Sequence, residues 1–315
     1  MPTTQTIATL TVENQTFYDR TLLERLLPEL HFYRDADKKV IPRGKGTSIE
    51  FRKFNSLPIP GASLTEGVTP AGNSLNITSI TATAKQEGDF VEVSDVLDIA
   101  SKDPVITETS ELCGEQSGQT VDIRTRDVVT AGTTVQYANG RATQAALLQT
   151  DVLTGREVRL AKARLKKNNV KPFEDGCYHL VIDAEQEFDF KNDVASNGFI
   201  EVSKYAQPDK LLDGEIGKYD GVRICVTSNI ETITVGSGSS AVSVHKAIMY
   251  GRHAYGVTSV EKGEGKASVI VKPLGSSGTA DPLNQRATIG WKMFFVAKRL
   301  NELAICRIET GATQI

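Results

Sequence analysis

Two segments with alternating apolar and polar residues flank a long stretch without periodicity, and this arrangement limits the possible folds more than any other feature. The alternating apolar positions are Ile49 and Phe51 before the stretch and Ile80, Ala82 and Ala84 after it. Alternation of this kind predicts two β-strands. The stretch between them, Pro58 to Asn73, has turn-forming residues throughout and exceeds the roughly 12–15 residues beyond which structureless loops are uncommon. We therefore expect residues 47–95 to form a very long hairpin. Because a two-stranded ribbon alone is marginal in water, it should lie on another subunit.

The first 46 residues predict a second element that cannot be stable alone. Glu13 to Leu27 carries Tyr18, Leu22 and Leu26 at helical spacing, and Pro28 ends the pattern. The residues that follow are charged and interrupted by Pro and Gly. One short helix on a polar tether needs a partner surface, in this chain or in a neighbour.

Asp103 and Pro104 predict the start of a long helix that could run to about Ala131, with Asp103 as N-cap and Pro104 as first helical residue. The expected inner face is thin: Ile106, Ser110, Cys113, Ser117, Val121 and Val128. Gly114 and Gly118 each cost about 1 kcal/mol relative to Ala inside a helix. Two explanations stay open for them, which are ordinary imperfection of the helix and close contact of this face with another backbone.

From about residue 141 the pattern is mixed α/β. Thr154 to Glu157 has the sequence of a capping box, and the helix after it should bury Val158, Ala161 and Leu165 and end at Asn168–Asn169. Further expected elements, in chain order, are a strand at Tyr178–Ile182, a strand at Val222–Thr227, apolar runs around a Gly/Ser loop within Ile233–His245, and two segments, 247–250 and 254–260, that fit either a strand or a short helix. The end of the chain predicts a hairpin, with Thr288–Arg299 and Leu303–Glu309 joined at Asn301–Glu302.

Composition places the chain among ordinary folded proteins and argues against two kinds of partner. Hydrophobic residues make up 39% of the 315 residues and charged residues 24%. The formal net charge of -3 argues against a protein that works by coating nucleic acid. No stretch approaches the roughly 20 apolar residues of a membrane span, and the N-terminal residues lack the pattern of a secretion signal. The four widely spaced cysteines are expected to be reduced thiols in the core, as in a cytoplasmic protein.

Catalytic and ligand-binding motifs are missing from the sequence. Gly265–Lys266 lacks the rest of a P-loop, no GxSxG is present, and the four histidines have no metal-ligand spacing. We expect His179 to be a structural histidine with satisfied hydrogen bonds. The acidic residues Glu185, Glu187 and Asp189, and the basic run from Lys162 to Lys167, should be solvated surface. The sequence therefore predicts no catalytic residue, cofactor or metal, and no enzyme activity.

Several strings, taken in order, resemble the major capsid proteins of tailed bacteriophages, in particular the podovirus-type coat family. The strings are Thr16–Asp19, Ile49–Phe54, Leu64–Pro70, Glu92–Leu97, Gly214–Gly217 and Gly278–Arg286. The resemblance covers nearly the whole chain. It implies an α+β protein with the Johnson fold, which is shared with the capsid floor of herpesviruses.

The resemblance also implies a division of the chain and a set of partners. Residues 1–46 would be the N-terminal arm, 47–95 the extended loop, 96–140 with 287–315 the peripheral domain built on a long spine helix, and 141–286 an α/β axial domain. Contacts with neighbouring subunits would come from these loop residues: Leu64, Thr65, Glu66, Val68, Thr69, Pro70 and Asn73. The arm would add Phe17, Tyr18, Leu22 and Leu26.

The implied function is self-assembly, as hexamers and pentamers, into an icosahedral shell around double-stranded DNA. The shell would form in the cytoplasm of the host bacterium and become part of the virion. Scaffolding and portal proteins would be partners, a decoration protein could be another, and DNA would be enclosed without sequence-specific binding. Two alternatives stay open, an encapsulin-like nanocompartment shell and a hydrolase of mixed α/β class.

Overall fold

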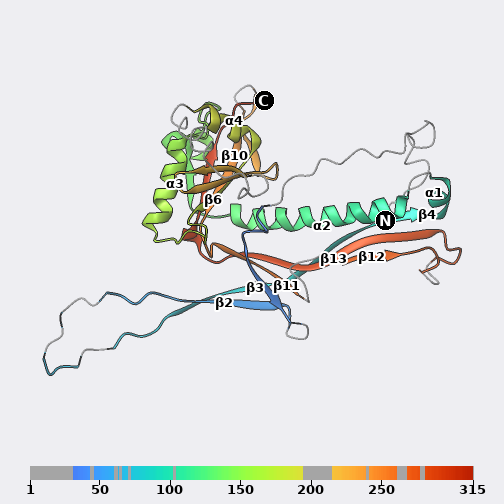
Figure 1. The fold of residues 1–315 in the computed structure, drawn as a ribbon, viewed down its shortest axis with the longest axis horizontal. Coiled ribbons are helices and arrows are strands. Elements are labelled where there is room, and N and C mark those ends of the chain that lie inside the picture. The colour runs from blue at the N-terminus through green and yellow to red at the C-terminus, as the bar shows by residue number, and fades with distance from the viewer. Residues whose placement is uncertain are drawn as a thin grey trace.

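The computed structural model describes residues 31–42, 46–59, 63, 66–69, 72–101, 104–193, 215–238, 241–260, 268–276 and 281–314. Two sheets hold most of the strands in this part of the chain. They lie at different ends of an elongated molecule, and a third, two-stranded ribbon extends away from both (Figure 1). The helix predicted at Glu13–Leu27 lies outside the described residues.

The first sheet has β13 at its centre. Its strands are β1 (Asp37–Ile41), β4 (Lys85–Ser94), β11 (Tyr255–Val260), β12 (Ser268–Lys272) and β13 (Arg286–Arg299). Strand β4 pairs along one edge of β13, while β11 and β12 share the other edge. Strand β1 extends the sheet by parallel pairing with β11.

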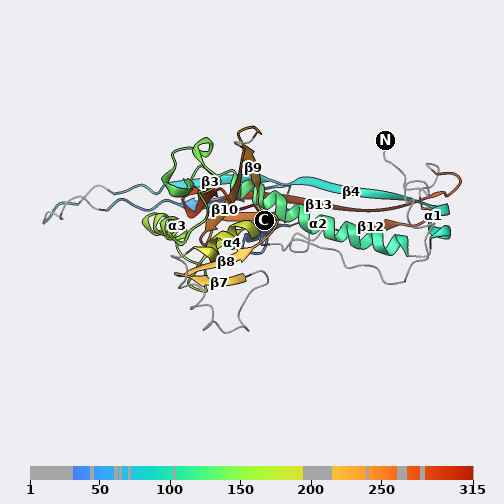
Figure 2. The same ribbon diagram turned by 90° about the horizontal axis from the view of Figure 1, so that it is seen from above.

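Helix α2 (Val105–Thr130) covers one face of this sheet, and Figure 2 shows it running alongside β13 and β12. The reason lies in the alternation of β13, whose buried residues are Ala287, Ile289, Trp291, Met293, Phe295 and Ala297. The helix confirms the prediction for this segment, and its inner face includes the expected Cys113, Ser117 and Val121. It also buries residues that the apolar pattern missed: Thr109, Asp122, Thr125, Val129 and Thr130. The three threonines can face the core because each hydroxyl donates to the carbonyl four residues earlier. The predicted position of Pro104 is wrong, because Pro104 is the N-cap and Val105 is the first helical residue; Asp103 lies outside the described part of the chain.

The second sheet is a mixed α/β layer with the strand order β5-β14-β10-β6-β8-β7, and β9 pairs with β10. Its strands are β5 (Val135–Tyr137), β6 (Tyr178–Ile182), β7 (Glu215–Tyr219), β8 (Val222–Val226), β9 (Thr232–Val235), β10 (Val242–Tyr250) and β14 (Ile305–Thr310). Helices α3 (Gly155–Lys167) and α4 (Ala184–Asn192) lie against it (Figure 1). Short 3-10 turns link these elements: η1 (Ala138–Gly140), η2 (Gln144–Ala146) and η7 (Glu302–Ala304). The strands predicted at β6 and β8 are confirmed. The apolar runs around the Gly/Ser loop form β9 and β10, segment 247–250 is part of β10, and segment 254–260 forms β11 from Tyr255 onwards.

The predicted C-terminal hairpin is wrong. Strands β13 and β14 exist, but β13 pairs with β4, β11 and β12, whereas β14 pairs with β10 and β5. Their burial explains the separation. Strand β13 alternates and has one face available for solvent, while β14 is buried along nearly its whole length and fits the interior of the α/β sheet. Between them, the amides of Leu300 and Asn301 both donate to the carbonyl of Ala254 and turn the chain from one sheet to the other.

The long hairpin is shorter than predicted in its paired part. Strands β2 (Ser48–Phe54) and β3 (Ile77–Thr83) pair from Ser48↔Thr83 to Phe54↔Ile77. Strand β4, which continues the pattern to Ser94, leaves the ribbon and pairs with β13 instead. Because β3 is followed directly by β4, the ribbon is connected to the first sheet through β4.

The helix at residues 155–167 is confirmed, but its predicted capping box is wrong. Thr154 makes no side-chain cap bond, and Glu157 is buried and accepts a 2.6 Å hydrogen bond from Gln136 Nε2. A capping box occurs instead at α4, where the Gln186 side chain accepts from the amide of Asp183.

The prediction that the acidic stretch after β6 is a solvated face is also wrong. Asp189 is buried and accepts hydrogen bonds from the amide and the hydroxyl of Thr313. Glu185 pairs with His245 at 3.1 Å. In the sequence these acids lie in a polar segment. Asp189 is nevertheless buried, because the C-terminal residues pack against α4. In the basic run of α3, Lys162 is likewise mostly buried and pairs with Asp220 at 2.9 Å.

Candidate assembly surfaces

The β2–β3 ribbon presents apolar side chains that no described part of the same subunit covers. At its root, Phe51 and Ala82 are buried. Further out, the exposed large apolar residues are Phe54, Leu57, Ile59, Val68, Leu75 and Ile77. Ile59 is 92% exposed, which is unusual for an isoleucine in a folded protein. Figure 1 shows the ribbon and the described parts of its loop leaving the body on the side opposite to α1 (Asp95–Ala100). An exposed apolar surface of this kind marks an interaction site.

The loop residues that the sequence analysis selected are only partly described. Glu66, Val68, Thr69 and Asn73 are exposed at the end of the ribbon, where Gly67 adopts a positive φ of 77° within a turn. Leu64, Thr65 and Pro70 lie outside the described residues, as do the arm residues Phe17, Tyr18, Leu22 and Leu26. The four described residues lie together on the projecting loop and away from both sheets, so their role in contacts stays a prediction.

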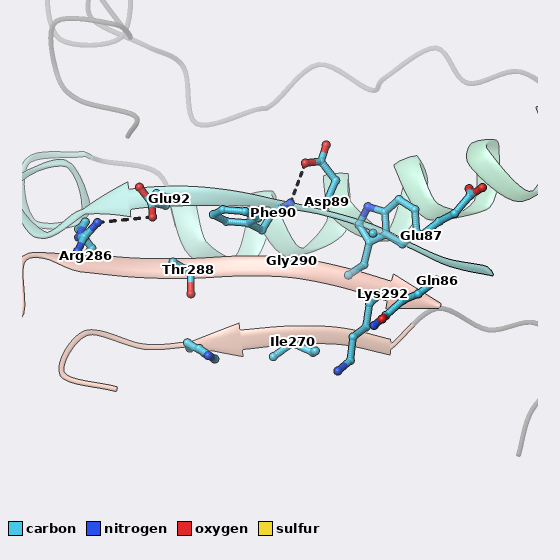
Figure 3. A pocket seen from close by; sticks show the side chains of 13 residues that line it. Gln86, Glu87, Asp89, Phe90, Glu92, Ile270, Arg286, Thr288, Gly290 and Lys292 are labelled. Carbon is cyan, nitrogen blue, oxygen red and sulfur yellow. Dashed lines mark hydrogen bonds and ion pairs between the residues drawn. The ribbon is translucent and has the colours of Figure 1, made fainter. Parts of the chain in front are cut away.

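The uncovered face of the first sheet holds a hollow of about 850 Å³ (Figure 3). It lies on the side of β13 opposite to α2 and is lined by β4, β12 and β13. Gly88 and Gly290 form part of its lining, and neither position has room for a side chain. A Cβ on Gly290 would lie 2.6 Å from Cβ of Phe90, and one on Gly88 would lie 2.5 Å from the carbonyl oxygen of Trp291. Both clashes are with the neighbouring strand of the same sheet, so the glycines let β4 and β13 pair closely.

Apolar and charged groups are combined around this hollow. Phe90 and Ile270 are partly exposed and flank Gly290 on the two neighbouring strands, which the pairing places in one row. Lys272 on β12 and Lys292 on β13 also line the hollow, and Arg286 is 3.7 Å from Glu92 at one end. Sequence reasoning did not select this surface. The two-residue alternation of β13 could have indicated its second face, but only the pairing with β4 and β12 shows which residues line it.

Buried polar groups connect the segment before β1 to the α/β sheet and to helix α2. Asp35 accepts hydrogen bonds from His179 on β6 (2.6 Å) and from the Tyr250 hydroxyl on β10 (2.8 Å). The amide of Tyr33 donates to Asp122 on α2. Burial alone would raise the pKa of Asp35, but the hydrogen bond and charge of His179, together with the charge of Arg34 and the hydrogen bond from Tyr250, outweigh it and lower the pKa from 3.8 to about 2. Burial raises the pKa of Asp122, which the amide of Tyr33 only partly offsets.

These polar groups join distant segments of the fold. His179 stacks on Phe173 and has Asp35 and Asp175 as partners, which confirms the structural histidine that was predicted. All four cysteines are free and buried, as predicted. Within the described ranges, no group of three or more potential ligands could hold a metal ion. No described helix is long and apolar enough to cross a membrane.

The fold, with its projecting ribbon, long helix along a sheet and separate α/β layer, is that of the subunits of bacteriophage capsids. The capsid of Ralstonia phage GP4 contains a chain that superposes with a TM-score of 0.76 at 13% identity, covering 99% of both chains. A chain of the cyanophage Pam1 capsid gives a TM-score of 0.70 at 13% identity over 97% of this chain and 98% of that one. The capsid of Helicobacter pylori bacteriophage KHP30 gives 0.68 at 11% identity, with coverages of 94% and 95%.

The sequence supports the same class. The profile of the phage capsid protein family matches residues 77–308. The chain therefore belongs to the phage capsid protein family, a family of structural proteins, and the predicted fold and class are confirmed. No curated protein sequence matches the chain significantly.

Proposed function

We propose that this chain is the major capsid protein that assembles with copies of itself, as hexamers and pentamers, into the icosahedral shell around a phage genome of double-stranded DNA. The observation that carries the proposal is the β2–β3 ribbon, whose exposed apolar side chains have no cover in the described part of the subunit. Contacts of a ribbon on one copy with a different surface on the next are heterologous, so they can close into rings and then into a shell. Family membership supports this function over a nanocompartment shell.

The partner surface for the ribbon is the uncovered face of the first sheet. Its hollow is lined by the apolar side chains of Phe90 and Ile270, which are exposed and can contact apolar groups of a neighbouring subunit. The ribbon is complementary to this surface, because it is narrow and exposes the apolar side chains of Phe54, Leu57 and Leu75. Leu64, Thr65, Glu66, Val68, Thr69, Pro70 and Asn73 would make further contacts beyond the sheet. The arm residues Phe17, Tyr18, Leu22 and Leu26 would pack on a second surface.

The division into arm (1–46), extended loop (47–95), peripheral domain (96–140 with 287–315) and axial domain (141–286) belongs to this proposal. Assembly in a bacterial cytoplasm with scaffolding and portal proteins, with room for a decoration protein, belongs to it as well. A structural role also implies that the subunit has no enzymatic activity of its own.

Negative-stain microscopy and gel filtration of the purified protein test the proposal together. We expect closed shells, or capsomer-sized oligomers that form shells when scaffolding protein is added. A compact monomer at every salt and protein concentration would favour the α/β hydrolase and overturn the proposal.

Two phenylalanines with nearly equal exposure allow a matched test of the sheet face. Phe90 is 52% exposed in the hollow and Phe188 is 51% exposed on α4. Phe90→Ser should raise the protein concentration needed for assembly at least tenfold without changing the melting temperature of the subunit. Phe188→Ser should have a smaller effect. Equal effects, or none from Phe90→Ser, would exclude the sheet face as the site of the ribbon.

A further inference from the structure

A second hollow, of about 620 Å³, lies at the root of the ribbon and is strongly basic. It is formed where β1, β2 and β3 meet two turns of the α/β layer, at 169–171 and 252–253. Six of its fourteen lining residues are cationic: Lys38, Lys39, Arg52, Lys53, Lys171 and Arg252. Among the described lining residues, Asp37 alone has a carboxylate, and it accepts from His253 at 2.7 Å. The hollow therefore carries a clear excess of positive charge.

Most of this charge has no counter-ion among the residues that the structure describes. Arg52 pairs with Glu50 and Arg252 with Glu174. Lys53 and Lys171 form no ion pair with any described residue, and neither do Lys38 and Lys39, which lie over the rings of Tyr33 and Phe51. Like charges held this close repel one another, so an anionic ligand would stabilise the site.

The floor of the hollow is apolar. Phe51 and Val170 are buried there, and Ile80 and Leu300 are partly exposed. A ligand that fits must therefore bring aliphatic groups as well as negative charge. This combination favours an acidic protein segment over a nucleic acid backbone, which would leave the apolar floor uncovered.

The chain itself contains a segment with the complementary chemistry. Helix α1 exposes Val96 (55%) and Ile99 (81%), and it carries Asp95 and Asp98 beside them. Asp98 has no hydrogen-bond or ion-pair partner among the described residues, and Asp95 accepts only from the amide of Val96 within its own helix. Helix α1 thus presents an acidic and apolar surface that no described part of the subunit covers.

The two surfaces cannot meet within one copy. Strand β4 runs from the root of the ribbon to α1, and its ten residues span roughly 33 Å. Figure 1 shows α1 and the ribbon at opposite ends of the molecule. Contact between them must join different copies, head to tail. We propose that the basic hollow at the ribbon root binds helix α1 of a second copy, with the aspartates facing the lysines and Val96 and Ile99 on the apolar floor. This inference rests on the proposed function, since it adds a second heterologous contact to the shell.

A charge exchange tests the contact. Lys53→Glu combined with Lys171→Glu reverses the charge at two positions of the hollow and leaves the ring contacts of Lys38 and Lys39 in place. Asp95→Lys combined with Asp98→Lys reverses the charge of helix α1. If this pair perturbs folding, Asp98→Lys alone is used. The control reverses two exposed lysines of α3, Lys166→Glu with Lys167→Glu. Assembly is followed by sedimentation velocity at low and high salt, and folding by the melting temperature of the dissociated subunit.

We expect each reversed surface to raise the assembly concentration at least tenfold at low salt and less at high salt. Combining the two reversals should bring it back to within about threefold of the unmodified protein, and the control should change it by less than threefold. If the unmodified protein does not assemble, the proposed function fails. If it assembles and the combined variant is no better than either reversal alone, this contact is excluded. Normal assembly of the hollow variant together with weaker binding of a DNA duplex would assign the site to phosphate and overturn the inference.

Discussion

His179 Nδ1 lies 2.6 Å from Oδ2 of Asp35, and both side chains are less than a tenth exposed. This contact joins the segment before β1 to the centre of the α/β sheet. The neighbouring residue Phe32 is fully buried in the same core, and its carbonyl accepts from the hydroxyl of Tyr255. The segment that connects the N-terminal residues to the body is therefore fixed by buried polar contacts on both sides.

The Asp35 contact predicts a pH dependence of subunit stability. The pKa of Asp35 is about 2 in the folded chain and 3.8 without the fold, so folding favours the ionised form. Its contribution, about 2 kcal/mol, is complete above the unfolded value and is lost as the pH falls from about 4 towards 2. Asp35→Asn should lower the urea midpoint of the dissociated subunit at pH 6, and the difference from the unmodified protein should shrink towards pH 3. Asp98→Asn, at an exposed carboxylate that has no partner among the described residues, is the control and should show no such trend. A difference that stays constant with pH would contradict the prediction.

Gly114 offers a test of the two explanations for glycine in α2. A Cβ at this position would meet nothing within 4 Å in the subunit. Gly114→Ala should therefore stabilise the dissociated subunit by up to about 1 kcal/mol. Gly88→Ala, where the new Cβ would lie 2.5 Å from a carbonyl oxygen, should destabilise it. Denaturant unfolding measures both, and a destabilising Gly114→Ala would contradict the packing. Shell assembly by the Gly114→Ala variant then separates the two explanations for this glycine. Assembly should be impaired only if this face of α2 contacts the backbone of a neighbouring subunit.

Deleting Gly61 to Asn73 and closing the ribbon with a short turn should leave the subunit folded and stop assembly. The described residues of this loop are exposed and contribute nothing to either buried core. The melting temperature of the dissociated subunit and the yield of particles are the two measurements. A control that keeps the loop length but replaces the same residues with Gly and Ser separates the loss of side chains from the loss of reach. A large fall in melting temperature would show that the loop belongs to the core.

The shell should be held by non-covalent contacts alone. Intersubunit isopeptide bonds occur in some phage shells of this fold and need a lysine near the tip of the loop. The segment from Pro58 to Ala84 contains none, and the nearest, Lys53 and Lys85, lie back in β2 and β4. Mature particles should therefore give a single band near 34.2 kDa on denaturing electrophoresis. A ladder of multimers that survives SDS and reductant would refute the prediction.

Local pattern determined the elements whose residues carry their own signal. The alternation around Ile49 and Ile80, the helical spacing of Val158, Ala161 and Leu165, and the buried run at β6 each predict a structure that the chain adopts. The ordered strings along the chain also indicated the protein class, because their combination is more specific than any single motif. The projecting loop was recognisable for a physical reason, since a segment without apolar periodicity cannot build a core of its own.

The tertiary structure decided which strands pair and which charged residues are buried. Strands β13 and β14 follow one another like a hairpin, yet each joins a different sheet, because pairing depends on which faces other elements cover. Glu157 and Asp189 look like surface acids in the sequence, but Gln136 and Thr313 reach them from distant parts of the chain. The hollow beside Gly88 and Gly290 likewise exists only after β4 and β12 have aligned on β13. Such surfaces depend on contacts between residues far apart in sequence, and no local pattern encodes those contacts.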